Sequence, residues 1–185
     1  MRIISGDARG RKLFAPSGED TRPTADRIRE SVFNILSRSV RESVVLDLFG
    51  GTGAMALEAL SRGAAYAVIV DLNREAIRAI ERNAEGVLKE AMPDRVKIVK
   101  ADYRTAIDAM QDVRFDLVFL DPPYRMTEAY ADALERLRKR GHLQKDCICL
   151  LERSNDAQIA LPEGFERYDV RTYGTTTVEF VREVS

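Results

Sequence analysis

The chain has 185 residues, of which 45% are hydrophobic and 32% are charged, and its formal net charge is −1. This length suits one α/β core and is too short for two full-sized ones, so we expect a single domain over 1–185. The composition is typical of a soluble globular protein and excludes a disordered chain. Because the net charge is close to zero, any affinity for nucleic acid would depend on a local concentration of Arg and Lys.

Targeting signals and metal-binding patterns are not recognisable in the sequence. No apolar run approaches the roughly 18 residues that predict a membrane span, and the Met1 end has no signal-peptide core, so we expect a cytoplasmic protein without a membrane partner. The cysteines, Cys147 and Cys149, lie two residues apart in an apolar run, which predicts one buried face of a strand. His142 is the only histidine, and we expect no metal site.

The first elements form an extension over 1–40. Two segments, 2–5 and 11–14, predict a small β-hairpin, and a helix capped by Thr24 is expected over 25–37. The apolar stripe of this helix is predicted to consist of Ile28, Val32, Phe33, Ile35 and Leu36.

The main core is expected over 41–185, where β-branched runs alternate with segments of helical period. This pattern predicts a parallel sheet flanked by helices. Its strands are predicted over 44–48, 66–71, 96–100, 115–120 and 147–151. Its helices are predicted over 54–62, 74–90 and 128–140, with Asn73 as the N-cap of the second and Gly141 ending the third.

The C-terminal part predicts a different strand arrangement. Segments 165–173 and 175–181 are joined by the turn Tyr173-Gly174, which indicates an antiparallel pair at the edge of the sheet. The predicted fold class is therefore α/β and Rossmann-like. It has a mostly parallel seven-stranded sheet with an antiparallel C-terminal edge, preceded by the small hairpin and helix.

A glycine-rich turn leads from the first core strand into a helix. It reads Asp47-Leu48-Phe49-Gly50-Gly51-Thr52-Gly53. Glycines there allow a sharp turn and a close approach of a ligand to the main chain, beside the positive end of the helix. A tight turn with no ligand, or a dinucleotide site, would use similar residues.

Carboxylates at other strand ends favour a ligand site. Asp71 closes the second strand about 20 residues after the glycine turn, where an acidic side chain can bind the ribose hydroxyls of an adenosine. Asp102 follows the third strand, although by itself it is equally typical of a cap. Since ligands of open parallel sheets bind at the carboxyl ends of the strands, we expect these residues to converge. The converging set is Asp47, Gly50, Gly53, Asp71, Asp102 and Asp121.

Asp47 favours a methionine-containing ligand over a dinucleotide. A carboxylate suits the cationic amino group of methionine and would repel a pyrophosphate. The third glycine of the dinucleotide pattern would fall at Ala56, which alone excludes nothing.

The tetrapeptide Asp121-Pro122-Pro123-Tyr124 follows the fourth core strand and predicts the reaction site. Two prolines fix an extended backbone and remove two amide donors, leaving the Asp121 carboxylate and the Pro122 carbonyl as acceptors. Acceptors suit an exocyclic amino group, whose hydrogens they would bind so that the nitrogen lone pair turns toward a methyl donor. Tyr124 offers a ring on which an unstacked base can lie. The alternative is an ordinary turn with a surface aromatic residue.

A covalent cysteine mechanism is not supported by the sequence. Both Cys147 and Cys149 fall inside a predicted core strand.

These residues resemble the RsmD-type bacterial methyltransferases, which methylate the exocyclic amino group of one guanine in 16S ribosomal RNA. The resemblance covers nearly the whole chain. Besides the glycine turn and the tetrapeptide, it includes Met1 to Gly6, Arg9 to Leu13, Arg22 to Glu30 and Tyr173-Gly174. The sequence departs from the family pattern at Gly51, Asp71 and Thr175, where alanine, glutamate and aspartate are common.

The resemblance implies a class I methyltransferase that uses S-adenosyl-L-methionine and acts on 16S rRNA or the small ribosomal subunit. We expect it to act as a monomer. Catalysis would involve Asp121 to Tyr124. The implied cofactor-binding residues are Asp47, Phe49, Gly50, Gly51, Gly53, Asp71, Leu72, Asp102 and Tyr103.

Basic residues in the first part of the chain suggest an RNA-contacting hairpin. The first dozen residues contain only one acid, Asp7, and four basic residues, Arg2, Arg9, Arg11 and Lys12. A solvated basic edge that deters aggregation is the alternative. Contact with RNA is also expected of Arg22, and some of Arg22, Arg27 and Arg29 are expected to pair with Asp26 and Glu30.

Three other functions remain open. An adenine-amino methyltransferase of DNA or RNA would share the tetrapeptide, but the DNA enzymes usually carry a target-recognition region for which this chain has no room. A non-catalytic module that binds adenosylmethionine or RNA is disfavoured by the intact Asp121. A nicotinamide-dependent oxidoreductase is disfavoured by Asp47.

Overall fold

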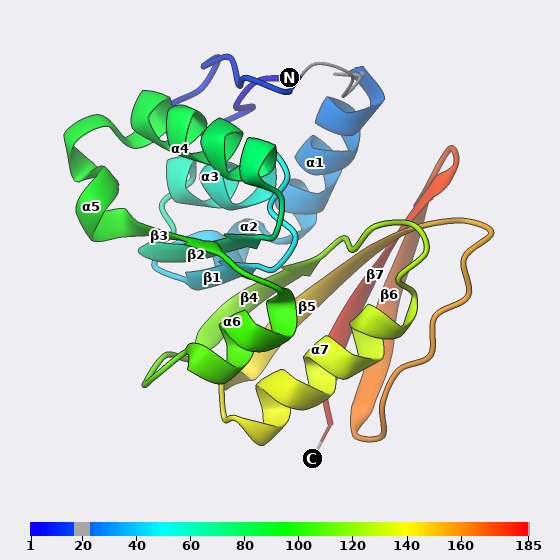
Figure 1. Ribbon diagram of the computed structural model, residues 1–185. Coiled ribbons are helices and arrows are strands. Elements are labelled where there is room, and N and C mark those ends of the chain that lie inside the picture. Colours follow the sequence, from blue (N-terminus) through cyan, green and yellow to red (C-terminus); the bar gives the residue numbers. More distant parts are fainter. Residues whose placement is uncertain (17–22, 185) are drawn as a thin grey trace.

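One seven-stranded sheet organises the computed structural model of the protein, which describes residues 1–16 and 23–184 (Figure 1). Its strand order is β3-β2-β1-β4-β5-β7-β6. The strands are β1 (Val44–Asp47), β2 (Tyr66–Asp71), β3 (Val96–Lys100), β4 (Phe115–Leu120), β5 (Leu143–Ser154), β6 (Phe165–Tyr173) and β7 (Thr176–Glu183). β1 to β5 pair in parallel, and β7 pairs antiparallel with both β5 and β6. The predicted Rossmann-like fold with an antiparallel C-terminal edge is confirmed.

The chain reverses its direction of travel across the sheet at β1, which lies between β2 and β4. In open parallel sheets a ligand crevice forms at such a point, outside the carboxyl ends of the strands. The ends of β1, β2 and β4 are Asp47, Asp71 and Leu120, and the last of these is followed directly by Asp121. The topology alone therefore brings three carboxylates to one edge.

The helices cover both faces of the sheet (Figure 1). On one face lie α1 (Pro23–Ile35), α2 (Ser37–Val40), α3 (Ala54–Ser61), α4 (Arg74–Leu88), the 3₁₀ turn η1 (Lys89–Ala91) and α5 (Met92–Arg95); on the other lie α6 (Tyr103–Ala109) and α7 (Glu128–Lys139). Each face has its own buried apolar cluster. Asn73 caps α4 as predicted, its side chain accepting from the amides of Glu75 and Ala76, and Gly141 follows α7 with a φ of 71°.

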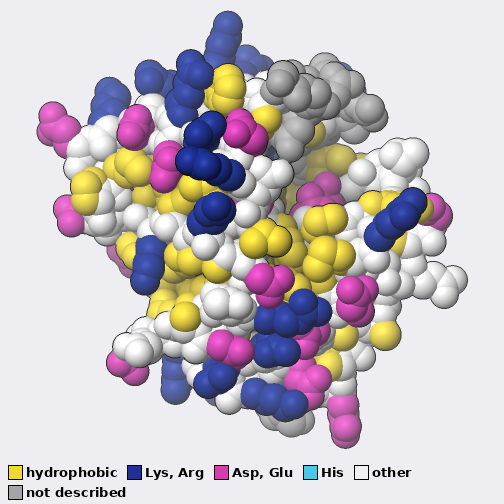
Figure 2. Space-filling view, in the orientation of Figure 1, with side chains coloured by type: hydrophobic (Ala, Val, Ile, Leu, Met, Phe, Trp, Pro, Cys, Tyr) yellow, Lys and Arg dark blue, Asp and Glu magenta, His cyan; other side chains and the backbone are white. Residues whose placement is uncertain are grey.

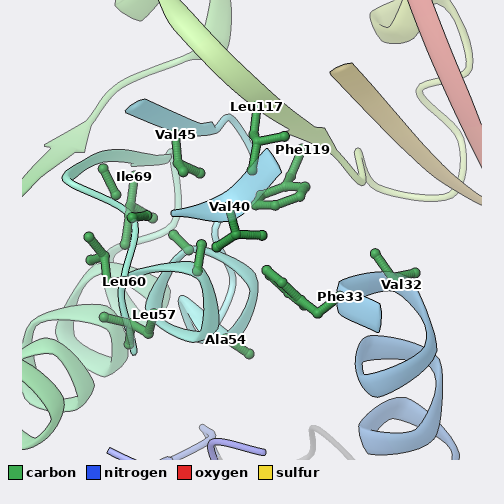
Figure 3. Packing of buried hydrophobic residues seen from close by; sticks show 14 of the residues in the cluster. Val32, Phe33, Val40, Val45, Ala54, Leu57, Leu60, Ile69, Leu117 and Phe119 are labelled. Carbon is green, nitrogen blue, oxygen red and sulfur yellow. The ribbon is translucent and has the colours of Figure 1, made fainter. Parts of the chain in front are cut away.

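α1 joins the sheet close to the predicted reaction site. Phe33 of α1 packs edge-on against Phe119 of β4, with 6.0 Å between the ring centroids, and Val40 lies beside them (Figure 3). Phe119 is two residues before Asp121, so this contact fixes the end of β4 from one side. The contact links residues 1–40 to the same apolar cluster as the sheet.

Two expectations about the helices are wrong, and a third helix was not expected. α1 begins at Pro23, so Thr24 lies in its first turn and is not the N-cap. Ile35 ends α1 and is 41% exposed, because the chain turns there and a separate short helix, α2, follows. α6 was not predicted, since its seven residues, Tyr103–Ala109, are too few to display a helical period.

The first fourteen residues pack on α3 through hydrogen bonds as well as apolar contacts. Arg2 and Lys12 form a single antiparallel bridge, so the predicted hairpin is present only as this minimal pairing. Ile3 and Leu13 are buried. The fully buried Glu58 of α3 accepts hydrogen bonds from the amides of Ile4 and Ser5, at 2.8 and 3.0 Å. The segment is thereby held by a carboxylate that has little contact with water.

Candidate active site

A cleft of about 720 Å³ opens at the carboxyl ends of the parallel strands. Its volume falls within the range of roughly 300–1,000 Å³ that is common for small-molecule sites. It is lined by Leu48, Phe49, Gly51, Asp71, Leu72, Asn73, Ala101, Asp102, Tyr103, Asp121, Pro122, Pro123, Tyr124 and Met126. The expected convergence of the strand-end aspartates therefore holds for Asp71, Asp102 and Asp121.

The glycines of the predicted loop divide into two kinds. Gly51 lines the cleft with a φ of 58°, and a Cβ built on it would meet nothing within 4 Å, so its main chain is open to a ligand. Gly50 faces inward, where a Cβ would lie 2.5 Å from Cγ2 of Ile69. Gly53 has a φ of 79° and donates its amide hydrogen to the carbonyl of Gly50. Gly50 and Gly53 shape the loop and do not line the cleft.

Asp47 is buried behind the loop, with 4% of its surface exposed, and does not line the cleft. Backbone amides of Phe49 and Ala56 donate to its carboxyl group, which ties the loop to the first turn of α3. Burial raises the pKa of Asp47 to about 7, and the nearby Asp71 adds to the increase. Asp47 therefore stabilises the shape of the loop. It affects the electrostatic potential in the cleft without contacting a ligand there.

Asp71 and Asp102 each hold a helix or loop and also line the cleft. The Asp71 carboxylate accepts the amide hydrogens of Gly51 and Asn73, at 2.9 and 2.8 Å. Asp102 caps α6 by accepting from the amide of Arg104 at 2.9 Å. Both alternatives considered for Asp102, a cap and a ligand-facing acid, are compatible with its position.

Three apolar side chains complete this part of the cleft. Phe49 packs against Tyr103 with 5.4 Å between ring centroids, and the Tyr103 hydroxyl donates to Asp132 at 2.7 Å. Leu72 is 65% exposed at the rim. These residues form an apolar wall beside two carboxylates, which suits an adenosine with its apolar ring faces and ribose hydroxyls.

The tetrapeptide after β4 forms the opposite wall. Pro122 is buried and Pro123 is exposed, and the Pro123 carbonyl accepts the amide hydrogen of Met126 at 2.8 Å. Tyr124 is 67% exposed, but its hydroxyl donates to Asp156 at 2.6 Å, which holds the ring in place. The hydrogen bond to Asp156 raises the pKa of Tyr124.

A second chamber of about 200 Å³ adjoins the first. It is lined by Asp121, Pro122, Tyr124, Thr127, Tyr130, Glu152, Arg153, Ser154, Ala157, Thr175 and Thr176. Asp121, Pro122 and Tyr124 line both chambers and form their common wall. The site therefore has two compartments that meet at the predicted reaction residues.

Glu152 adds a carboxylate that the sequence analysis missed. It follows Leu151, which pairs with Leu120 in the register of β4 and β5, so Glu152 comes level with Asp121. Tyr130 holds this position by donating its hydroxyl hydrogen to the Glu152 carbonyl at 2.5 Å. The signal was present, because Glu152 is an acid at the carboxyl end of a predicted parallel strand, as Asp71 and Asp121 are.

The carboxylates repel one another across the site. Loss of contact with water, followed by repulsion from Glu152 and then from Asp47, raises the pKa of Asp121 well above its usual value. Burial likewise raises the pKa of Glu152. Although the Asp121 residue as a whole is exposed, its carboxyl group is close enough to these two acids to be affected by their charge. A cation bound between them would relieve the repulsion.

The predicted RNA-binding residues lie away from the cleft. Arg2, Arg9, Arg11 and Lys12 are exposed, and Arg22 lies outside the described residues. Arg29 is buried, with its guanidinium on Asp26, on Glu58 and on the Arg2 carbonyl. Arg29 therefore attaches the N-terminal segment to α1 and α3 and cannot reach phosphate.

The cysteines line neither of the two chambers. Cys147 and Cys149 are both buried and free, in the apolar cluster beneath α6 and α7. A hydrogen bond with Cys149 and burial raise the pKa of the Cys147 thiol, which makes it a poor nucleophile. Within 1–16 and 23–184, no group of three or more His, Cys, Asp or Glu side chains is placed to hold a metal ion. None of the described helices is long and apolar enough to cross a membrane.

Known proteins are similar to this chain in sequence and in fold. The family model described as "Conserved hypothetical protein 95" matches residues 1–182. "Putative rRNA methyltransferase YlbH" of Bacillus subtilis is 32% identical over 99% of both chains. "Ribosomal RNA small subunit methyltransferase D" of Escherichia coli K12 is 33% identical over 82% of this chain and 74% of its own length.

A solved structure agrees with the sequence matches. "Putative methyltransferase yhhF" from Escherichia coli superimposes with a TM-score of 0.84 at 27% identity, covering 100% of this chain and 98% of its own. The chain therefore belongs to this family, the RsmD-type methyltransferases expected from its sequence, and is a methyltransferase.

Proposed function

We propose that the protein transfers a methyl group from S-adenosyl-L-methionine to the exocyclic amino group of a guanine in 16S ribosomal RNA. The relatives named for the small ribosomal subunit support the RNA, and the chemistry of the two chambers supports the cofactor and the base. We further propose that one chain acts alone as a single domain, since it supplies both chambers. A cytoplasmic location follows from the proposed substrate.

The larger chamber has the features that bind the cofactor in this proposal. The Asp71 carboxylate would accept the ribose hydroxyls, and Asp102 would bind the amino group of the adenine ring between Phe49, Leu72 and Tyr103. The open main chain at Gly51 would lie against the methionine part. The acids around Asp121 offset the positive charge that the cofactor carries on its sulfonium and amino groups.

The smaller chamber fits guanine better than adenine. Guanine presents two neighbouring donors on one edge, its ring N1–H and its exocyclic amino group, whereas adenine presents an amino group beside a ring acceptor. Asp121 and Glu152 place two acidic groups at this chamber. As carboxylates they accept both guanine donors, but one of them would face the lone pair of adenine.

When bound, S-adenosyl-L-methionine supplies an electrophilic methyl group on a positively charged sulfur. The chain has to orient the amino nitrogen, because the lone pair of that nitrogen is delocalised into the ring. Asp121 and the Pro122 carbonyl accept its two hydrogens, which turns the lone pair out of the ring and toward the larger chamber. Tyr124, held by Asp156, stacks on the base. The raised pKa of Asp121 makes its carboxylate a better acceptor for the proton that the nitrogen releases.

The observation that carries the proposal is the common wall of the two chambers. Asp121, Pro122 and Tyr124 line both, so a donor in one and an amino group in the other meet beside the same acceptors. A module that only bound cofactor or RNA would not require this arrangement.

The test is a methyl-transfer assay with three substrates. The purified protein is incubated with labelled S-adenosyl-L-methionine and small ribosomal subunits, naked 16S rRNA or duplex DNA, and the methylated nucleoside is identified after digestion. We expect guanosine methylated on its exocyclic nitrogen, from RNA or subunits only. Methylated adenine as the sole product would instead establish an adenine-amino methyltransferase, and label in DNA alone would exclude the RNA substrate.

A further inference from the structure

The outer surface of α4 carries arginines at a four-residue spacing. Arg74, Arg78 and Arg82 are all exposed, and residues four apart on a helix form a continuous ridge. At a rise of about 1.5 Å per residue, this ridge extends over about 12 Å. Its start adjoins the larger chamber, because Asn73, the residue before Arg74, lines that chamber.

Arg11 of the N-terminal segment occupies the next place on the ridge. The next helix position on the ridge, four residues after Arg82, is Gly86. A Cβ built on Gly86 would lie 3.2 Å from two guanidinium nitrogens of Arg11. The absence of a side chain at Gly86 thus leaves room for Arg11 on the helix surface. The four residues, Arg74, Arg78, Arg82 and Arg11, are called the arginine row below.

The N-terminal segment and α4 form one basic surface at this point. The guanidinium of Arg82 lies over the ring of Phe14, 4.4 Å from its centroid. Figure 2 shows dark blue Lys and Arg side chains gathered over the region where Figure 1 places α4 and the N-terminal segment. The arginine row therefore connects the rim of the cofactor chamber with the exposed Arg9 and Lys12.

The arginines on α6 and α7 have a different environment. Arg104, Arg136 and Arg140 bridge to Asp132 and Asp108 at 3.0 to 3.3 Å, so two carboxylates offset most of the charge of these three arginines. In the arginine row, Arg78 pairs with Glu75 at 3.1 Å, with both side chains about 60% exposed. An exposed pair of this kind is worth little and exchanges readily for another anion. Glu81 and Glu85 flank the row on the same helix.

We propose that the arginine row binds successive phosphates of a single RNA strand, and so guides the nucleotides next to the target base along α4 toward the N-terminal segment. This inference rests on the proposed RNA substrate and adds a binding surface outside the two chambers. Guanidinium groups suit phosphates through paired hydrogen bonds, and a row that begins at the cofactor chamber holds the strand while one base enters the site.

The test compares two triple variants with the same loss of charge. The row variant is Arg11→Gln, Arg74→Gln and Arg78→Gln, which spares Arg82 because it packs on Phe14. The control variant is Arg114→Gln, Lys139→Gln and Arg140→Gln, at exposed positions beside the opposite ends of β4 and β5. Binding of a fluorescein-labelled single-stranded RNA, of 16S rRNA and of small subunits is measured between about 50 and about 200 mM salt.

We expect the row variant to reduce the slope of log affinity against log salt by about 2, since each contact with a single strand contributes about 0.7. Across that fourfold range of salt, the unaltered protein should lose about 16-fold more affinity than the row variant. The control variant should keep the original slope, and all three proteins should bind S-adenosyl-L-methionine equally.

Two outcomes would overturn the inference. One is an unchanged salt slope for the row variant; the other is an equal decrease in both variants, which would mean that only net charge matters. Loss of binding to small subunits without loss for either RNA would assign the row to a ribosomal protein and would also contradict it. Because binding is measured without methyl transfer, a failure of the proposed reaction would be recognised separately, by the absence of methylated guanosine.

Discussion

At the scale of single residues, Asp121 separates methyl transfer from cofactor binding, because its carboxylate lies at the junction of the two chambers while the ribose and adenine positions are formed by other residues. Replacing Asp121 with Ala should lower kcat by at least about 100-fold, the usual contribution of a well-placed acid or base group. The dissociation constant for S-adenosyl-L-methionine, measured by calorimetry, should change little. An equal loss of cofactor binding and transfer would mean that Asp121 belongs to the cofactor site alone.

Tyr124 allows the ring and the hydroxyl to be tested separately. Tyr124→Phe removes the hydrogen bond to Asp156 and keeps the stacking surface, whereas Tyr124→Ala removes both. Because stacking of a base on an aromatic ring is worth about 1–3 kcal/mol, the Ala variant should lower kcat/KM for RNA by about 5- to 150-fold. The Phe variant should stay within a few-fold of the original. Similar losses in both would show that the hydroxyl, and not the ring, carries the effect.

Asp47 should make stability depend on pH. Its pKa of about 7 in the folded chain exceeds the ordinary 3.8, so between these values the folded chain binds a proton that the unfolded chain does not. The contribution of Asp47 to the free energy of unfolding is therefore fully present below about pH 4, and it is lost as the pH rises through 7. Since one pKa unit corresponds to about 1.4 kcal/mol, the full cost of ionising buried Asp47 is about 4 kcal/mol.

Asp47→Asn cannot ionise and should escape this cost. Urea unfolding should therefore show the variant gaining stability relative to the original protein between about pH 5 and about pH 8, by about 3 kcal/mol, because about two of the three pKa units lie above pH 5. Asp121 and Glu152 remain in both proteins, but repulsion from Asp47 contributes to the raised pKa of Asp121, so its removal adds to the gain in stability at the higher pH. A stability difference that is the same at both pH values would mean that the Asp47 carboxylate is not desolvated as its burial indicates.

At the scale of elements, the loop after β1 combines a packing glycine with a ligand-facing one. Gly50→Ala forces a methyl group within 2.5 Å of Ile69, whereas Gly51→Ala meets nothing within 4 Å. The first should destabilise the protein by about 1–3 kcal/mol through overpacking. The second should cost about 1 kcal/mol for its positive φ and act mainly on cofactor affinity. Thermal unfolding and calorimetry would distinguish them, and a larger stability loss for Gly51→Ala would contradict these roles.

The strands were predictable to within about two residues wherever β-branched runs were bounded by turns, as in β2 and β4. β5 was not, because the polar start of Leu143–Ser154 carries no strand pattern and is extended only by pairing with β4. α6 was missed because its seven residues are too few to display a helical period, although Asp102 was recognised as a possible cap. The local sequence pattern therefore located the elements whose ends are marked by turn residues. It did not locate segments whose conformation depends on pairing with a neighbouring strand.

The same limit applies to the site. Asp71 and Asp121 were predictable because a parallel sheet brings the carboxyl ends of its strands together. The distinction between Gly51, which faces the cleft, and Asp47, which is buried behind it, depends on how α3 packs against the loop. Glu152 depends on β5 lying next to β4, which is a property of strand order and not of any local sequence.

At the scale of the whole molecule, residues 1–14 pack as part of the core and not as a separate appendage. Deleting them would expose the surface that buries Ile3 and Leu13 and would leave Glu58 without two amide donors. At about 1.5–3 kcal/mol for each buried side chain, we expect a loss of about 3–6 kcal/mol in the free energy of unfolding. Arg9→Gln, in the same segment but exposed, should change it by less than about 0.5 kcal/mol. A deletion as stable as the full chain would mean that the segment is an independent unit.

The wall shared by the two chambers has a consequence for inhibition. Because Asp121, Pro122 and Tyr124 line both compartments, an adenosine in one and a guanine in the other would contact the same three residues. A bisubstrate compound, in which the two are joined by a short link in place of the transferred methyl group, would occupy both compartments at once. Its second half would bind at the high effective concentration set by that link, so its affinity should exceed that of either half by orders of magnitude.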